Sequence, residues 1–239
     1  MRLALATLAL SLSSSALAAN IAIYDDYAGA PWSGAAATAL GHSVLVYYND
    51  GPSFAAACAS ADMCIVESPN WYVGADVSNA IAAAVAASRP VIVEYWTFQG
   101  EPSMNAALGI TPTDYYTPFG SITSAGSVNF FSTFGGTMYW PGSYDAGING
   151  STFAVASGFI AANPGVIAVT NGGRSIANGF LSYDFQNADS DGDGKNDPQE
   201  IYEAEIGYLL SGGGPTITLT GSPCPSSVTV AARGFTPRR

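Results

Sequence analysis

The sequence predicts an α/β fold with three layers: an open, mostly parallel sheet flanked by helices, with an antiparallel hairpin at one edge. From Asn20 onward, short apolar runs alternate with helical patterns, which is typical of a parallel sheet between helices. The connections are short, so neighbouring strands should be parallel with right-handed crossovers. We expect strands at 21–24, 43–48, 63–67 and 91–96, and helices near 32–40, 53–61 and 75–88.

The first 19 residues have the pattern of a secretory signal peptide. Arg2 precedes an apolar run, and Ala16-Leu17-Ala18 forms a small-x-small cleavage pattern. Cleavage is expected after Ala18 or Ala19, and no later stretch is long and apolar enough to span a membrane. We therefore expect a protein outside the cytoplasm, either periplasmic or extracellular. The domain should occupy residues 20–211.

The middle of the chain breaks the alternating pattern. After a short helix at 104–108, residues 100–149 are rich in Gly, Ser and aromatic side chains, and hairpin strands are expected at 129–133 and 137–140. The aromatic residues form either a stacking surface for sugar rings or a satellite core. They are Tyr115, Tyr116, Phe119, Tyr139, Trp140 and Tyr144. A helix at 153–161 and strands at 166–170 and 175–183 should follow, the two strands joined by a tight turn at Asn171-Gly172-Gly173.

Four strand-forming stretches carry a family resemblance. IAIYDDY, TALGHSVLVYY, SADMCIVES and RPVIVEYW resemble the opening of the flavodoxin-like and class I glutamine amidotransferase-like folds, including non-catalytic secreted relatives. The resemblance covers roughly residues 20–210. It also extends to response-regulator receivers, but Glu67-Ser68-Pro69 lacks the phosphoacceptor Asp, and the chain is expected to be exported.

The amidotransferase resemblance implies a nucleophile on a sharp turn between a strand and a helix, with a His and an acid nearby. The sequence has neither GxCxG nor GxSxG, and its sole histidine, His42, falls in a turn between a helix and a strand. We therefore expect the chemistry of that family to be absent.

Residues 189–200, DSDGDGKNDPQE, match a 12-residue calcium loop that leads into a helix at 198–210. Carboxylates stand at positions 1, 3, 5, 9 and 12, the Lys195 carbonyl at position 7, and Gly194 at the sharp turn of position 6. The predicted ligands are Asp189, Asp191, Asp193, Lys195, Asp197 and Glu200. The alternative is an acidic surface loop without a metal.

Position 8 of this loop separates it from a paired EF-hand. An EF-hand that pairs with a sister loop usually has a branched apolar residue there, whereas this chain has Asn196 followed by Pro198. The loop therefore resembles the solitary loops of thrombospondin type 3 repeats and secreted bacterial proteins. We expect Ca²⁺ to hold the last helix in place rather than to act as a switch.

Acidic residues also follow the predicted strands, where open α/β sheets bind their ligands. Asp25 and Asp26 follow the first strand, Glu67 the third and Glu94 lies on the fourth. Two such carboxylates can serve as acid and base in glycoside hydrolysis. The other interpretation is that they cap helices or stand in solvated loops.

The net charge disfavours two classes of binding partner, and the cysteines allow one disulfide within the chain. The net charge of −11 becomes −12 once Arg2 is removed, so nucleic acid and anionic membranes are poor partners. Cys58 and Cys64 either form a local disulfide or are buried apolar residues, and Cys224 is left over. Residues 212–239 form a Gly-Pro linker and a β-like tail, which is either a truncated Ig-like module or a strand that docks on the domain.

Two classes of function follow from these observations. The first is a secreted, non-catalytic calcium-binding module that binds a glycan or a protein. The second is a secreted hydrolase that uses some of Asp25, Asp26, Glu67 and Glu94. The geometry of those carboxylates distinguishes the two, because a hydrolase needs a pair that faces one pocket.

Overall fold

The computed structural model describes residues 18–26, 31–68, 72–115, 121–124, 130, 137–139, 146–149, 152–157, 165–185 and 188–212. The expected signal peptide, apart from its last two residues, and the expected tail from residue 213 lie outside the described residues, so both stay predictions.

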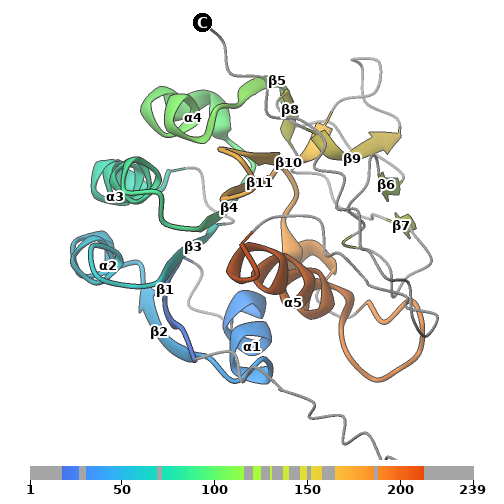
Figure 1. Cartoon of the computed structure of the whole chain (residues 1–239). Coiled ribbons are helices and arrows are strands. Elements are labelled where there is room, and N and C mark those ends of the chain that lie inside the picture. Colours follow the sequence, from blue (N-terminus) through green and yellow to red (C-terminus); the bar gives the residue numbers. More distant parts are fainter. Residues whose placement is uncertain are drawn as a thin grey trace, which may run out of the picture.

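Five parallel strands form one side of the sheet, in the order β2-β1-β3-β4-β11 (Figure 1). The first four strands confirm the expected positions to within one residue at each end. β3 and β4 are buried along their whole length, which explains why their sequences are almost continuously apolar. The five strands are β1 (Asn20–Asp25), β2 (Ser43–Tyr48), β3 (Met63–Ser68), β4 (Val91–Tyr95) and β11 (Ser175–Asn178).

Helices cover both faces of this sheet (Figure 1). One face carries α1 (Trp32–Ala39) and α5 (Asp197–Leu210), which pack against each other. The other face carries α2, α3 and α4, and these pack side by side. Their bounds are Gly51–Cys58, Gly74–Ala86 and Pro102–Leu108. The three-layer arrangement is therefore confirmed.

The expected antiparallel hairpin is also confirmed. β10 (Gly165–Thr170) runs antiparallel to β11 and adds a sixth strand to the five parallel ones. Beyond β10 the sheet continues through further antiparallel strands. These are β9 (Thr152–Ser157), β6 (Ser121–Ser124) and β7 (Thr137–Tyr139), while β8 (Ala146–Asn149) pairs with both β10 and β5 (Thr111–Tyr115).

Two expectations for this half of the chain are wrong. Residues 152–157 form strand β9, not the start of a helix, because TFAVAS pairs with β10 on one side and β6 on the other. That pairing overrides the helical propensity of its alanines. The strand expected at 175–183 ends at Asn178, and a 3₁₀ turn, η3 (Ser182–Phe185), follows. The strand expected at 137–140 is β7, whereas only Phe130 of the other expected hairpin strand is described, in a turn.

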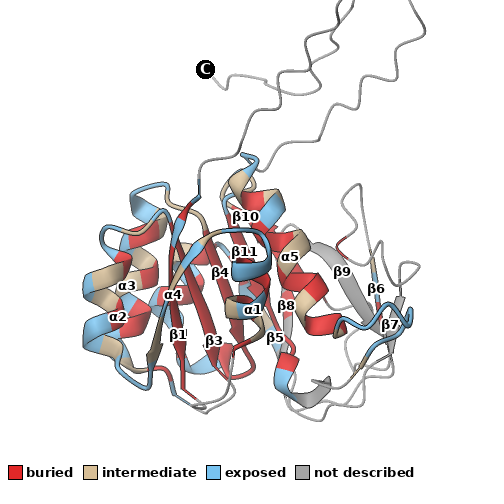
Figure 2. Cartoon of the chain, turned by 90° about the horizontal axis from the view of Figure 1, so that it is seen from below, coloured by how far each residue is buried: buried red, intermediate tan, exposed pale blue. Residues whose placement is uncertain are grey.

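The core has one apolar layer on each face of the sheet (Figure 2). Isoleucines of the sheet pack under α1 and α5 against Tyr202, Ile206 and Leu209. Val66 of β3 and Val91 and Val93 of β4 point the other way and pack under α2, α3 and α4, together with Phe54, Ile81 and Tyr95. A disulfide between Cys58 and Cys64, with a Cα–Cα distance of 5.6 Å, joins the end of α2 to β3.

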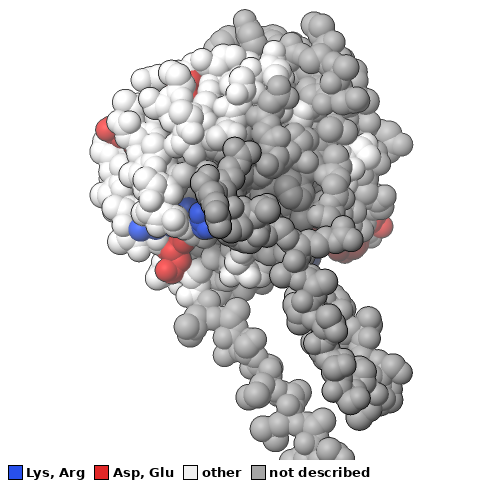
Figure 3. All heavy atoms as spheres, turned by 45° about the horizontal axis from the view of Figure 1, so that its top comes forward, with Lys and Arg blue, Asp and Glu red and all other residues white. Residues whose placement is uncertain are grey.

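The chain has few charged residues, with 7 Lys and Arg and 18 Asp and Glu in 239 residues. In the face drawn in Figure 3, Lys, Arg, Asp and Glu appear only as scattered spots among uncharged side chains. In the described part of the chain, no helix combines the length and the apolar character needed to cross a membrane.

Candidate functional site

The acidic loop lies between η3 and α5 (orange in Figure 1). Three exposed aspartates, Asp189, Asp191 and Asp193, bring one carboxylate oxygen each to within 4.8 Å of one another. Oxygens bound to one Ca²⁺ at 2.3–2.6 Å can lie up to about 5 Å apart. The cluster therefore has dimensions that one calcium ion could occupy.

Two glycines shape this cluster. Gly192 and Gly194 have φ angles of 76° and 90°, in the left-handed region that favours glycine. Their N–H groups donate to the two oxygens of Asp189, at 2.8 and 3.1 Å. The loop is thus wound around the first aspartate, with Gly194 at the sharp turn that the sequence predicted.

Two of the other predicted ligands, Asp197 and Glu200, are not members of the three-aspartate cluster. Asp197 is buried at the first position of α5 and accepts hydrogen bonds from the N–H and hydroxyl of Ser190, at 2.7 and 2.5 Å. Glu200 is buried in the first turn of the same helix. The Lys195 N–H donates to Asp193, and its ammonium group pairs with Glu203 at 2.9 Å. The loop is therefore joined to α5 through Ser190 and Lys195.

A second set of acidic residues lies in a row across the sheet. The register places Asp25, Glu67, Glu94 and Asn178 side by side on four neighbouring strands, near their carboxyl ends. Their contacts with α1, η3 and α5 place Glu67, Glu94 and Asn178 on the α1 and α5 face. All four residues are buried.

Glu67 caps α1 from the sheet. Its carboxylate accepts the backbone N–H groups of Trp32 and Ser33, both at 3.0 Å, and the Ser33 hydroxyl at 2.6 Å. The residue before the helix is Pro31, whose side chain cannot accept these bonds. The positive end of the helix dipole further favours a carboxylate here.

Glu94 shares a serine with Glu67. The Ser182 hydroxyl lies 2.9 Å from Glu94 and 3.1 Å from Glu67, and the Ser182 N–H donates to Glu94 at 2.9 Å. The Tyr202 hydroxyl of α5 donates to the other Glu94 oxygen at 2.8 Å. Burial, followed by the nearby Glu67, raises the pKa of the Glu94 carboxyl well above its ordinary value. A protonated Glu94 can donate to Ser182, which in turn donates to Glu67.

This network joins the helices to the sheet, and its acidic members are buried. A glycosidase needs two carboxylates that flank a substrate, with room between them. Here a serine side chain stands between Glu67 and Glu94. Asp26 is also buried, and it accepts the Ser68 hydroxyl at 2.5 Å. The arrangement therefore favours the structural interpretation of these acids over the hydrolytic one.

Residues that the sequence reasoning missed complete the network. Asn178 donates to Glu205 of α5 at 3.0 Å, and both side chains are buried. The burial of Glu205 could have been predicted from helical spacing, because Glu205 lies three residues after Tyr202 and directly before Ile206, on the apolar face of the helix. No sequence signal identifies Ser182, which reaches the two glutamates only through the fold.

The two cysteines within the described residues do not provide the nucleophile that the amidotransferase resemblance implies. Cys58 and Cys64 are bonded to each other, so neither is a nucleophile. Nδ1 of His42 accepts the Ala19 N–H at 3.2 Å, far along the sheet from the strand-end acids. Of the six aromatic residues expected to form a surface, Tyr115 and Tyr139 lie in β5 and β7, but their side chains are outside the described set. Tyr116, Phe119, Trp140 and Tyr144 lie outside the described residues, so the glycan surface stays a prediction.

Comparison with known proteins identifies the fold. No family model and no curated protein matches the sequence. Among solved structures, a ThuA-like protein from Bacteroides uniformis has a TM-score of 0.51 at 10% identity, over 80% of this chain and 90% of that chain. The N-terminal domain of mmIFT52 has a TM-score of 0.53 at 12% identity, over 80% and 97%.

A glutamine amidotransferase from Methylobacillus flagellatus has a TM-score of 0.50 at 12% identity, over 78% of this chain and 93% of that one. At such identities the likeness concerns the fold alone. The resemblance deduced from the strand sequences is thereby supported: the chain has an α/β fold similar to glutamine amidotransferase-like and ThuA-like domains.

Proposed function

We propose that this chain is a secreted, non-catalytic calcium-binding module, in which Ca²⁺ fixes the start of α5 and the domain binds a glycan or an extracellular protein. One observation carries the calcium assignment. Asp189, Asp191 and Asp193 hold their carboxylate oxygens within 4.8 Å of one another in a loop wound by left-handed glycines.

The chemistry of the cluster fits a hard cation. Calcium takes six to eight oxygen ligands and tolerates irregular geometry. Three carboxylates confined to one small volume repel each other, and a divalent ion between them removes that repulsion. In this proposal the Lys195 carbonyl adds a fourth ligand, while Asp197 and Glu200 connect the ion to the helix.

The role we assign to the ion follows from what α5 buries. Ile201, Tyr202, Ile206 and Leu209 all pack in the core under this helix. Asp197 at its first position already binds Ser190 of the loop, so the loop and the helix must move together. Sites of this extracellular type bind calcium at roughly 10⁻⁴ to 10⁻³ M. At about ten times that concentration, binding would stabilise the fold by about 1.4 kcal/mol.

We propose a non-catalytic role because the buried glutamates of the sheet already make structural hydrogen bonds. Glu67 and Glu94 are used within the fold, as a cap for α1 and as a partner of Tyr202. Both described cysteines form a disulfide. The expected secretion agrees with that bond, because disulfides persist in oxidising compartments.

Calorimetric titration of the mature protein with CaCl₂ tests the proposal. We expect one site per chain, with affinity reduced at least tenfold by Asp191→Asn, which leaves the fold untouched because Asp191 is exposed. Asp76→Asn, an exposed acid in the first turn of α3, is the matched control and should bind as the wild type does. Wild-type protein that binds no calcium, or equal binding by Asp191→Asn, would refute the assignment.

A further inference from the structure

Strand β2 ends the described part of the sheet, and within that part its outer edge is open. Among the described strands it pairs only with β1 (Figure 1). The N–H of Ser43 donates to Ala19 and that of Asn49 to Asp25, at 2.9 and 2.8 Å. Because backbone groups alternate in direction along a strand, odd-numbered residues face β1. The N–H and C=O groups of residues 44, 46 and 48 therefore point to the open edge.

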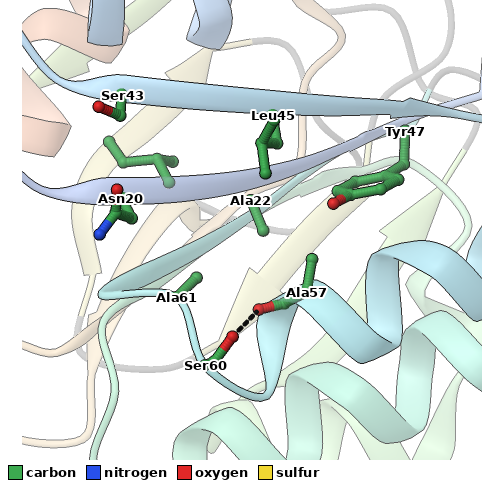
Figure 4. A pocket seen from close by; sticks show the side chains of 9 residues that line it. Asn20, Ala22, Ser43, Leu45, Tyr47, Ala57, Ser60 and Ala61 are labelled. Atoms are coloured by element: carbon green, nitrogen blue, oxygen red, sulfur yellow. Dashed lines mark hydrogen bonds between the residues drawn. The ribbon is translucent and has the colours of Figure 1, made fainter.

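This edge lacks the features that normally prevent strand pairing. Proteins protect open edges with charged residues, prolines or bulges, and SVLVYY contains no charge and no proline and pairs with β1 in unbroken register. Leu45 is 63% exposed. Beside it, on the α2 side, lies a groove of about 360 Å³ whose lining residues are all uncharged, and Figure 4 shows Leu45 and Tyr47 directed towards Ala57 and Ala61.

Local charge permits a second copy of the chain at this edge. The chain has a net charge of −11, so most of its surface repels another copy. The β2 strip is uncharged, and two such strips can meet without that repulsion.

The open backbone groups are also self-complementary. They lie at residues 44, 46 and 48, symmetric about Val46. A second strand placed antiparallel on a two-fold axis through Val46 pairs Val46 with its own copy and Val44 with Tyr48 of the second copy. Each open N–H then meets an open C=O. Leu45 lies opposite Tyr47 of the second copy, an apolar and aromatic pair on the groove side.

The two ends of β2 carry complementary groups in this register. His42 comes two residues before Val44, and Asp50 comes two residues after Tyr48, so His42 of one copy is level with Asp50 of the other. Nδ1 of His42 accepts the Ala19 N–H, which leaves Nε2 to carry the proton and act as a donor. Asp50 is an exposed carboxylate that already accepts the Ser53 N–H at the start of α2, and a carboxylate has lone pairs to accept a further donor.

We propose that two copies of this chain associate by antiparallel pairing of their β2 strands about a two-fold axis at Val46, forming one continuous sheet. A contact based on one strand pair is at the low end of interface sizes, so the dimer should depend on concentration.

Sedimentation velocity of the protein from Ala19 onward, which keeps the contacts of Ala19 with His42 and Ser43, tests the association across a range of concentrations. The mean mass should rise towards twice that of one chain, and Leu45→Lys, a change at an exposed position, should keep the protein monomeric. Tyr72→Lys is the matched control, because Tyr72 is 67% exposed in the connection between β3 and α3, and it should dimerise as the wild type does. A wild-type mass of one chain at every concentration, or a Leu45→Lys dimer, would overturn the proposal.

Single cysteines test the register in a Cys224→Ser background, which removes the leftover thiol. Val46→Cys should form a disulfide-linked dimer on mild oxidation, because directly opposed residues have Cα atoms about 5.5 Å apart. Val44→Cys should not, because its two copies would be offset by about 13 Å along the strands. Equal cross-linking of both variants, or no cross-linking of either, refutes the two-fold pairing. No cross-linking together with a monomeric mass is the result expected if the chain's own tail or a different protein occupies the edge.

Discussion

Replacing Glu205 with glutamine should remove much of the pH dependence of stability. Glu205 lies on the buried face of α5 and receives one hydrogen bond, from Asn178 at 3.0 Å. Its other oxygen has no hydrogen-bond partner within the described part of the chain. Burial raises the pKa of this carboxyl to about 8, so the folded protein holds it protonated at neutral pH.

The sign and size of the effect follow from this pKa. Below about pH 4.5 the carboxyl is protonated in both states, and its full contribution to stability is present. Between about pH 4.5 and 8 the unfolded chain loses the proton while the folded chain keeps it, so the free energy of unfolding falls as pH rises. A difference of about 3.5 pH units corresponds to roughly 5 kcal/mol at most. Glu67 and Glu94 add to the loss, because burial raises the pKa of both.

Urea unfolding at pH 5, 7 and 9, at one fixed calcium concentration, measures this effect. Glu205→Gln keeps an acceptor for Asn178 and cannot ionise, so it should match the wild type at pH 5 and exceed its stability at pH 9 by several kcal/mol. Glu203→Gln, which loses only the contacts with Lys195 and Gln199, is the control on the same helix and should follow the wild-type pH profile. The reasoning fails if Glu205→Gln and wild type lose stability equally between pH 5 and 9.

Two further substitutions test other parts of the fold. Ser182→Ala removes the donor shared by Glu67 and Glu94 and should lower the free energy of unfolding, measured in urea, by about 1–3 kcal/mol. The control Ser60→Ala loses only an exposed hydrogen bond to the Ala57 carbonyl and should cost far less. Equal losses in the two variants would contradict the shared-serine network. The double change Cys58→Ala and Cys64→Ala should cost about 2 kcal/mol for so short a loop, and a loss below about 0.5 kcal/mol would show that the disulfide adds little to stability.

The parallel half of the sheet could be predicted because its pattern is local. Runs such as MCIVES and VIVEY are buried on both faces, so the apolar run and the strand nearly coincide.

The stretch from Phe153 was wrongly predicted as a helix because alanine-rich TFAVASGFIAA suits both helix and strand. Only the pairing of β9 with β10 and β6 decides between them, and those partners are distant in sequence.

In the candidate sites, too, features local in sequence could be predicted and contacts between distant residues could not. The three aspartates of the acidic loop lie within five residues, so their spacing alone predicts that they cluster. The sequence also places Glu67 and Glu94 correctly at the ends of their strands. It cannot say that Glu67 caps α1 or that Ser182 stands between the two glutamates, because those contacts span 34 to 115 residues.

The most direct test of the central claim, that calcium holds α5 in place, is the thermal midpoint of the mature protein in millimolar calcium and in chelator. We expect a higher midpoint with calcium, and the loss of most of that shift in Glu200→Gln, because Glu200 would connect the ion to the first turn of α5. Asp76→Asn should keep the full shift. Superimposed wild-type curves with and without calcium would contradict the account, and a full shift in Glu200→Gln would separate calcium binding from the anchoring of α5.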